Sequence, residues 1–450
     1  AEALSRASAG QTIVVRPGTY RETVKIGKSI KLLGEPGAVI KGSDVWTGWT
    51  KEGNAWTRPY SYSWYQHGEG SARARLADQV FVNGQPLQQE TSQGSVSSGK
   101  FYVGNGKIYI GTDPSGKTVE VTTRERWVQG ENKVSNVTVK GFTMTHGAIY
   151  AQRGGFWDGG GSGWTIENND MSYAHGAGVQ INGNNAVLRN NKIHHNGQIG
   201  IVTSYDTSQK PRNQLVEGNE IFNNNTEGFD AGWEAGGTKF SRTTGLVVRD
   251  NHVHHNQGSG LWFDIDVHDT TVSGNRIHHN LDRGITYELS SSGLIEHNVV
   301  WENGFGFDEG VWGSGILIQN STDCIVRNNV VAWNADGIGI VQQRRDPWTE
   351  VKNTQVHDNV IAVRNGTLLG WVSEIEPKSL FDARSNNRAS NNRYHHAGTG
   401  FMGLWLWDGK PWTFAGFNQS IEDKSGQLLN KNEVAPLLSR VGLPLTPESR

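Results

Sequence analysis

The sequence predicts an all-β fold, a right-handed parallel β-helix whose short strands stack as the coils of a solenoid. The main observation is a column of asparagines that recurs every 22 to 32 residues. An apolar residue stands three positions before each asparagine, and another stands two positions after it. Short β-branched strands separated by asparagine and glycine turns, without helical patches, are typical of such coils. The column consists of Asn169, Asn191, Asn219, Asn251, Asn275, Asn298, Asn329 and Asn359.

A second asparagine stands five positions after six of these residues, and a weaker copy of the pattern has Phe142 in the asparagine position. We expect the side-chain amides to stack at the turns, where each satisfies its neighbour or backbone groups. A low-complexity asparagine tract would not keep two apolar columns in register. The right-handed sense follows from the general bias of parallel β connections.

Other segments fit around this solenoid. Residues 1–8 predict a short amphipathic capping helix, and IVVRPGTY and SIKLLGEPG predict strands of the first coil. Between about Trp46 and Arg126 the repeat gives way to hairpin-like alternation with Asn-Gly and Asp-Pro turns, which indicates an inserted antiparallel β-subdomain. A tryptophan-rich segment from Phe401 to Phe417 is expected to close the C-terminal end. The predicted domains are residues 1–45 (cap and first coils), 46–127 (β-rich insert), 128–395 (catalytic β-helix core) and 396–450 (closing segment).

Composition and charge exclude several classes of protein. The chain is too aromatic for a disordered chain, with 17 tryptophans, and no apolar run approaches the roughly 20 residues of a membrane span. A formal charge of −2 gives no field that would attract nucleic acid. The lone Cys324 excludes a disulfide framework and a cysteine-based metal site. The chain starts at Ala1 without a targeting segment, so we expect a trimmed protein, secreted or of the cell envelope, with a carbohydrate partner and an undetermined oligomeric state.

Two carboxylates are the strongest candidates for chemistry. Several coils contain a strand that begins with glycine, and counting four residues from Gly260 and Gly284 reaches Asp264 and Glu288. Both side chains are predicted to project from the same face of adjacent coils, about 4.8 Å apart. Retaining glycosidases hold their two carboxyl groups about 5 to 5.5 Å apart, and mutual repulsion raises one pKa as a general acid requires. Solvated surface carboxylates are the alternative interpretation.

Neighbouring residues suggest how a sugar would be held. Asp266 is predicted to share the face of Asp264, and His268 follows it. One coil earlier, Glu234 is placed to hold a sugar hydroxyl and Lys239 to stabilise the charge of a nucleophile, although the two alternatively pair with each other. Outward indoles are natural platforms for sugar rings, which makes Trp233 and Trp262 candidate binding residues.

Paired histidines recur at one turn offset in successive coils: His194/His195, His254/His255 and His278/His279. No carboxylate stands at a fixed spacing from them, so stacking along the solenoid is favoured over a metal site. The predicted hydrolase needs no cofactor and no metal.

The coils from about Val128 to Asn365 resemble the pectate-lyase-like right-handed β-helix proteins. Within that superfamily, EAGGTKF, GLWFDID and ITYELS are similar to motifs of the glycoside hydrolase family 120 β-xylosidases. The resemblance implies that Asp264 is the nucleophile, Glu288 the acid/base and Glu234 a substrate-holding residue. After the aspartate the family tends to have a tryptophan, whereas this chain has Ile265 and Asp266. The residues that follow Glu288 also differ from the family's motif. The resemblance therefore implies the reaction class more strongly than xylose specificity.

Two alternatives remain open. A uronate lyase or epimerase would use Lys239, Arg344 or Arg345 as the base, with calcium held by acids around Asp206, Asp230, Asp308 and Glu309. A non-catalytic carbohydrate-binding solenoid would use aromatic platforms and solvated carboxylates. The preferred prediction is a retaining O-glycosyl hydrolase that degrades a poly- or oligosaccharide by a two-carboxylate mechanism.

Overall fold

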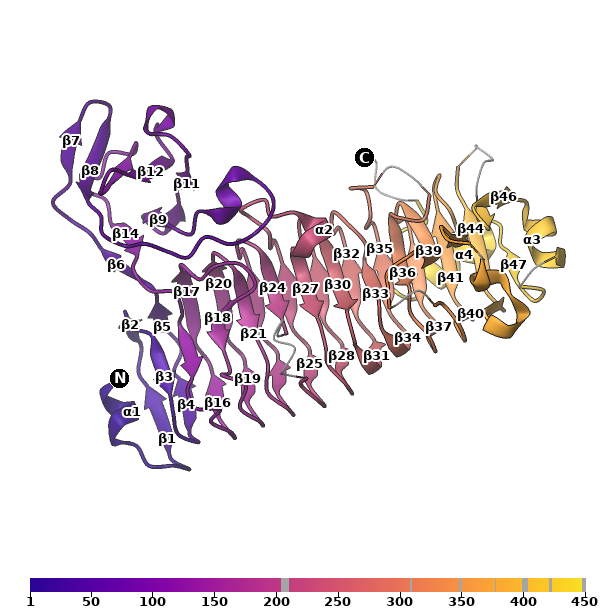
Figure 1. Cartoon of the computed structure of the whole chain (residues 1–450), viewed down its shortest axis with the longest axis horizontal. Helices are drawn as coiled ribbons and strands as arrows, with labels where there is room; N and C mark the ends of the chain where they lie inside the picture. Colours follow the sequence, from indigo (N-terminus) through magenta and orange to yellow (C-terminus); the bar gives the residue numbers. More distant parts are fainter. Residues whose placement is uncertain are drawn as a thin grey trace. The chain divides into compact units, whose positions relative to one another are not determined.

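The structure is a computed structural model that describes residues 1–203, 210–307, 310–347, 350–376, 378–398, 404–420 and 423–446. The chain divides into two compact units. Unit 1 comprises Ala1–Val202 and Asn223–Ala235, and unit 2 comprises Thr203–Phe222 and Gly236–Arg450. In each unit, strands of successive coils lie side by side and form parallel sheets, which we call sheets A, B and C (Figure 1).

Unit 1 contains the first coils. Its strands follow the chain in the repeating order that a solenoid requires, and each pairs in parallel with the equivalent strand of the next coil. Sheet A has β1 (Thr12–Val15), β4 (Lys31–Gly34), β16 (Thr138–Lys140), β19 (Thr165–Glu167) and β22 (Val187–Arg189). Sheet B has β2 (Gly18–Tyr20), β5 (Ala38–Lys41), β17 (Thr143–Gly147), β20 (Asp170–Ala174) and β23 (Lys192–His194). Sheet C has β3 (Val24–Ile26), β15 (Val128–Gly130), β18 (Gly154–Trp157), β21 (Ala177–Gln180) and β24 (Ile199–Val202).

The predicted antiparallel insert also belongs to unit 1. One sheet contains β6 (Ser43–Val45), β9 (Val80–Val82), β10 (Gln85–Pro86) and β14 (Val119–Thr122), and the other contains β7 (Thr50–Glu52), β8 (Ala55–Pro59), β11 (Gln88–Gln89), β12 (Lys100–Gly104) and β13 (Lys107–Ile110). Most of their pairings are antiparallel. The N-terminal helix α1 (Glu2–Arg6) is shorter than predicted, and its Leu4 shares a cavity with Ile13 and Leu32 of the first coil.

Unit 2 continues the same three-strand pattern. Sheet A has β25 (Leu215–Glu217), β28 (Val247–Arg249), β31 (His268–Ser273), β34 (Ser291–Glu296), β37 (Ile325–Arg327), β40 (Gln355–His357) and β43 (Arg388–Ser390). Sheet B has β26 (Glu220–Phe222), β29 (His252–His254), β32 (Arg276–His278), β35 (Val299–Trp301), β38 (Val330–Ala332), β41 (Val360–Val363), β44 (Arg393–His396) and β47 (Gln427–Leu428). Sheet C has β27 (Gly236–Phe240), β30 (Ser259–Asp264), β33 (Ile285–Glu288), β36 (Ser314–Gln319), β39 (Asp336–Gln342), β42 (Leu369–Ser373), β45 (Trp405–Trp407) and the antiparallel β46 (Lys410–Trp412).

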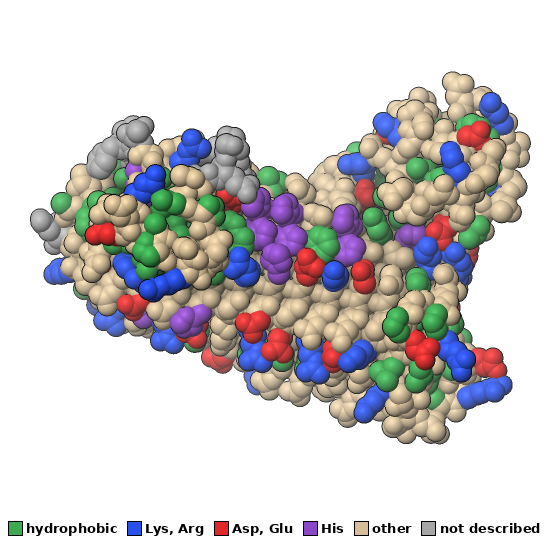
Figure 2. All heavy atoms as spheres, turned by 180° about the vertical axis from the view of Figure 1, so that it is seen from behind, with side chains coloured by type: hydrophobic (Ala, Val, Ile, Leu, Met, Phe, Trp, Pro, Cys, Tyr) green, Lys and Arg blue, Asp and Glu red, His purple; other side chains and the backbone are tan. Residues whose placement is uncertain are grey.

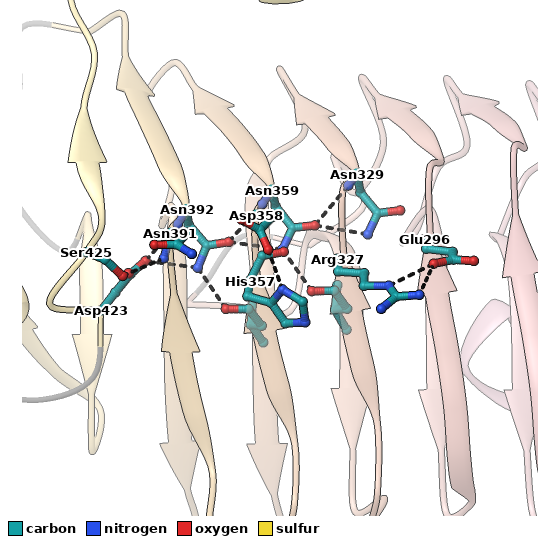
Figure 3. Close-up of polar contacts among 12 residues, drawn as sticks. Glu296, Arg327, Asn329, His357, Asp358, Asn359, Asn391, Asn392, Asp423 and Ser425 are labelled. Atoms are coloured by element: carbon teal, nitrogen blue, oxygen red, sulfur yellow. Dashed lines mark hydrogen bonds and ion pairs between the residues drawn. The ribbon is translucent and has the colours of Figure 1, made fainter.

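Asparagine side chains form the predicted ladder between coils. In unit 2, Asn298 donates from its backbone N and its Nδ2 to Asn329 Oδ1, at 2.9 and 3.0 Å. Asn329 donates to Asn359 in the same way, and Asn359 to Asn392 (Figure 3). Asn392 extends the column beyond the eight predicted members and donates to the buried carboxylate of Asp423 at 2.9 Å. Each buried amide is therefore satisfied by the next coil, as the sequence predicted.

The turn before each ladder asparagine needs a left-handed residue. Backbone φ there lies between 53° and 67°, a region that asparagine, aspartate and glycine enter more readily than other residues. This turn redirects the chain from sheet A to sheet B. It explains why the positions before the ladder are Asn168, Asn190, Gly218, Asp250, Gly274, His297, Asn328, Asp358 and Asn391.

The C-terminal region covers two surfaces of unit 2. Trp405 and Phe417 are buried, and the ring of Trp405 contacts Tyr394 and Phe414. The helix α3 (Phe414–Ser420) follows the antiparallel pair β45 and β46. The helix α4 (Lys431–Ser439) packs Val434 and Leu438 on a cluster with residues of β38 and β41, along the side of the solenoid.

The predicted fold class, a parallel β-helix with a small antiparallel insert and few helices, is confirmed. Outside the strands, unit 1 also contains α2 (Ala231–Glu234). Within the described part of the chain, no helix is long and apolar enough to cross a membrane.

Candidate functional site

Asp264 and Glu288 lie directly beside each other at the ends of two adjacent parallel strands. The register of β30 and β33 pairs Asp264 with Glu288, and that of β33 and β36 pairs Glu288 with Gln319. Counting four residues from Gly260, Gly284 and Gly315 reaches these three positions, so the counting rule is confirmed for their coils. The same count from Gly200 reaches Ser204, which lies outside the described residues. Both carboxylates are buried, with exposed fractions of 4% and 5%.

Lys239 holds one side of Asp264. Its Nζ lies 2.8 Å from Asp264 Oδ2 and 3.9 Å from the ring centroid of Trp262. The strand register explains the contact, because Lys239 of β27 pairs with Trp262, two residues before Asp264. Asp264 Oδ1 is buried and makes no hydrogen bond with any described residue. The cation therefore occupies Oδ2 of Asp264, while Oδ1 keeps its lone pairs for another atom.

Glu288 has different partners. Trp262 Nε1 donates to Oε2 at 3.2 Å, and the guanidinium of Arg345 lies 2.9 Å from Oε1. Burial and the negative charge of Asp264 raise the pKa of Glu288, and the cations of Arg345, Lys239 and Arg283 oppose this effect only in part. The net result is a carboxyl that retains its proton to higher pH than an ordinary glutamate.

Trp262 does not form the exposed platform that the sequence suggested. Its side chain is on the predicted face, but only 5% of its surface is exposed. Lys239 covers the indole ring, and the N–H group is directed at Glu288. The expectation of an open sugar platform at this position is therefore wrong, because the two charged neighbours enclose the ring.

Asp266 does not share the face of Asp264. The strand ends at Asp264, and Ile265 and Asp266 both adopt left-handed φ angles of 62° and 64°. Asp266 instead forms ion pairs with Lys210 at 2.5 Å and His268 at 2.7 Å. Partial burial raises the pKa of Asp266, but the contacts with Lys210 and His268 outweigh it and the pKa falls below its usual range. The two consecutive left-handed residues broke the period-two rule on which the prediction depended.

His268 begins β31 and is fixed at both ring nitrogens. Nε2 contacts Asp266, and Nδ1 lies 2.6 Å from the hydroxyl of Ser291. This arrangement makes His268 part of the support of the turn that follows Asp264.

Glu234 and Trp233 belong to unit 1, on the short helix α2. Glu234 is buried, its Oε2 accepts from Gln152 Nε2 at 3.1 Å, and its carbonyl accepts from Gln198 Nε2 at 2.8 Å. Trp233 is half-buried and contacts the ring of His67 edge to face, with ring centroids 5.7 Å apart.

Of the candidate calcium ligands, Asp230 accepts a hydrogen bond from Gly232 N at the start of α2. Asp206, Asp308 and Glu309 lie outside the described residues. Arg345, which the sequence offered only as a possible base, emerges as a direct partner of Glu288 from 57 residues further along the chain.

Comparisons with known proteins agree with this architecture. No curated protein matches the chain. Among solved structures, XylC in complex with xylose superposes with a TM-score of 0.70 at 20% identity, covering 90% of this chain and 82% of that one. The A-module of the Azotobacter vinelandii mannuronan C-5 epimerase AlgE4 gives a TM-score of 0.53 at 14% identity, covering 90% and 93%. The AlgE6 A-module gives 0.51 at 15% identity, covering 91% and 92%.

The model of the right-handed beta helix region matches residues 126–265, 155–312 and 245–416. These matches together span more than half of the chain. They contain all the coils that carry Asp264 and Glu288, with the same parallel three-strand pattern seen in the structure. The chain belongs to the right-handed β-helix family.

Proposed function

We propose that the chain is a retaining glycoside hydrolase in which Asp264 is the nucleophile and Glu288 the acid/base. The observation that carries the proposal is the direct pairing of these two residues on adjacent strands, with different partners for each. Adjacent strands stand about 4.8 Å apart, which is compatible with the roughly 5 to 5.5 Å carboxyl separation of retaining enzymes. A raised pKa at Glu288 and a lysine-stabilised Asp264 are the division of roles that such a pair needs.

The chemistry proceeds in two balanced steps. Asp264 Oδ1 attacks the anomeric carbon while Glu288 gives its proton to the leaving oxygen, and the bond between that oxygen and the sugar breaks. Glu288, now ionised, then removes a proton from water, which attacks the anomeric carbon and releases Asp264. Trp262 and Arg345 orient Glu288, and the ion pair with Lys239 orients Asp264. No cofactor takes part in these steps.

The substrate we propose is a glycoside of a xylose-like sugar within a poly- or oligosaccharide. Support comes from the similarity to XylC, whose structure was solved with xylose, and from the resemblance of EAGGTKF, GLWFDID and ITYELS to motifs of the family 120 β-xylosidases. A substrate of this kind fits a protein of the secreted or cell-envelope class, which is where we place the chain.

Activity on a panel of aryl glycosides tests the proposal. We expect release of the aryl group from a xyloside, with proton NMR showing the initial sugar product in the anomeric configuration of the substrate. Asp264→Asn and Glu288→Gln should each lower kcat/KM by about 10³-fold or more on an unactivated substrate. Asp266→Asn is the matched control and should retain most activity, because its contacts are with Lys210 and His268. Inversion of configuration, or near-normal activity in either active-site variant, would contradict the mechanism.

A second candidate is a uronate epimerase or lyase. It is favoured by the cations of Lys239 and Arg345 beside the two carboxylates, and by the similarity to AlgE4 and AlgE6. Incubation with uronate polymers, with and without a chelator, separates the candidates. Absorbance at about 235 nm reports the unsaturated product of a lyase, and NMR reports an epimerised polymer. Either signal in the absence of glycoside hydrolysis would replace the proposed function.

A further inference from the structure

A group of histidines lies on the outer side of sheet B in unit 2, apart from the carboxylate pair of sheet C. Glu220 of β26 pairs in register with His252 of β29, and His254 of β29 pairs with His278 of β32. Because side chains alternate along a strand, His252 and His254 point to the same side, and the neighbouring strands add Glu220 and His278 to it. Histidine side chains gather visibly on one face of the molecule (Figure 2).

Three of these residues bring possible metal ligands together. One ligand atom each from Glu220, His252 and His254 can be chosen so that all lie within 4.8 Å of one another. His254 Nε2 lies 3.4 Å from Glu220 Oε1. Two ligand atoms that each lie about 2.1 Å from a tetrahedral zinc ion are about 3.4 Å apart. His254 Nε2 and Glu220 Oε1 therefore already have the separation that coordination requires. Two imidazoles and one carboxylate form a recognised donor set for zinc, which leaves a fourth position for water.

Neighbouring groups hold the imidazoles in place. His252 Nε2 lies 2.7 Å from His278 Nε2, and the ring of His254 stacks on that of Phe222 and on that of His278. His278 in turn stacks on Trp301 at a centroid distance of 4.1 Å. The stacking expected from the sequence is therefore present, but Glu220 adds a carboxylate from a strand 32 residues before His252.

The charges around the cluster also suit a metal. Imidazole binds a metal ion through the lone pair of a ring nitrogen, and the carboxylate of Glu220 supplies negative charge beside it. Arg276 lies beside the cluster, but its guanidinium contacts other groups. It lies over the ring of Trp301 at 4.9 Å and donates a hydrogen bond to the carbonyl of Val441.

We propose that Glu220, His252 and His254 form a binding site for one divalent transition-metal ion of the zinc type. Imidazole nitrogens favour such ions over Ca²⁺ and Mg²⁺, which prefer oxygen ligands. The ion joins β26 to β29, two strands of adjacent coils, and stabilises unit 2 because it binds the folded chain. The site is separate from the proposed hydrolase chemistry, whose two carboxylates lie on sheet C.

Metal binding to the purified, tag-free chain tests the proposal. After treatment with chelator and dialysis, titration with Zn²⁺ should show one site per chain with a micromolar or tighter Kd. Loading with Co²⁺ should give visible absorption bands of four-coordinate intensity, because tetrahedral Co²⁺ absorbs far more strongly than octahedral Co²⁺. Zn²⁺ should raise the melting temperature of the wild type, and Ca²⁺ should not.

Variants identify the ligands. His254→Asn and Glu220→Gln should weaken Zn²⁺ binding by at least tenfold, whereas His357→Asn should leave it unchanged, since His357 pairs with Asp358 elsewhere on the solenoid. Far-UV circular dichroism verifies that each variant is folded, and the Co²⁺ spectrum of the wild type provides a readout that needs no variant. Absence of a site below 100 μM, an octahedral Co²⁺ spectrum, or equal binding by the two ligand variants and the control would each overturn the proposal.

Discussion

The buried ion pair between Lys239 and Asp264 makes a quantitative prediction. The two side chains are only 6% and 5% exposed, and 2.8 Å separates the charged atoms. Lys239→Met keeps a flexible apolar chain against Trp262 but leaves Asp264 buried without its cation. Removal of one partner from such a pair costs about 3–5 kcal/mol, because the remaining charge keeps its desolvation penalty. We expect the free energy of unfolding at pH 7 to fall by that amount.

A double-mutant cycle distinguishes charge from packing. Adding Asp264→Asn to Lys239→Met removes the stranded charge, so the double variant should recover most of the loss. Lys210→Met is the matched control: its partner is also an aspartate, Asp266, but the lysine side chain is 61% exposed, and a surface pair contributes about 1 kcal/mol or less.

Guanidinium unfolding, followed by both tryptophan fluorescence and circular dichroism, provides the measurement. Coincident transitions are needed before the free energies are compared. A loss below about 1 kcal/mol in Lys239→Met, or a double variant no more stable than that single variant, would refute the account of a buried charge pair.

Three further changes have defined outcomes. Arg345→Gln removes a cation that opposes the raised pKa of Glu288, so this pKa rises further. The acid then stays protonated to higher pH, and the basic limb of the pH–rate profile moves to higher pH. A basic limb that stays in place or moves to lower pH would contradict the role of Glu288 as the acid. Trp262→Phe deletes the N–H donor to Glu288 and should lower kcat/KM on aryl glycosides about tenfold or more, as initial-rate kinetics would measure. Asn298→Ala should lower the unfolding free energy by about 2–4 kcal/mol in the same guanidinium assay, because the backbone N of Asn275 and the carbonyl of Val272 lose their hydrogen bonds. The control is Asn328→Gly, which changes an exposed asparagine.

Periodicity explains why the sequence predicted so much of the fold. The ladder asparagines and their apolar neighbours repeat in eight successive copies, so an error in one copy is corrected by the others. The count from Gly260 and Gly284 gave the register of Asp264 and Glu288, which the strand pairing confirms. Residues inside the repeat are therefore predictable from their place in the period.

Features outside the period were not predictable. Arg345 reaches Glu288 from an irregular segment after β39, and no pattern relates the two positions. Asp266 was predicted on the wrong face because Ile265 and Asp266 both adopt left-handed backbone conformations. A β-branched isoleucine favours extended backbone, so its presence does not predict such a turn. Glu220 is different: it follows Asn219 as His252 follows Asn251, so the repeat does place the two side by side, but the carboxylate was sought only at a fixed spacing from the paired histidines.

The ladder in unit 2 has a direction. Within the row, each asparagine donates from its backbone N and its Nδ2 to Oδ1 of the next asparagine, and the last acceptor is Asp423, whose Oδ2 receives bonds from Asn392 and Tyr394. An ionised carboxylate has no hydrogen to pass on, so it is a natural terminator for a row of donors. A whole coil duplicated or deleted between Asn219 and Asn392 would leave each bond of the row with an equivalent partner. The asparagine row itself therefore accommodates a change by whole coils within this segment, whereas an extra coil after Asp423 would meet a group that offers it no donor.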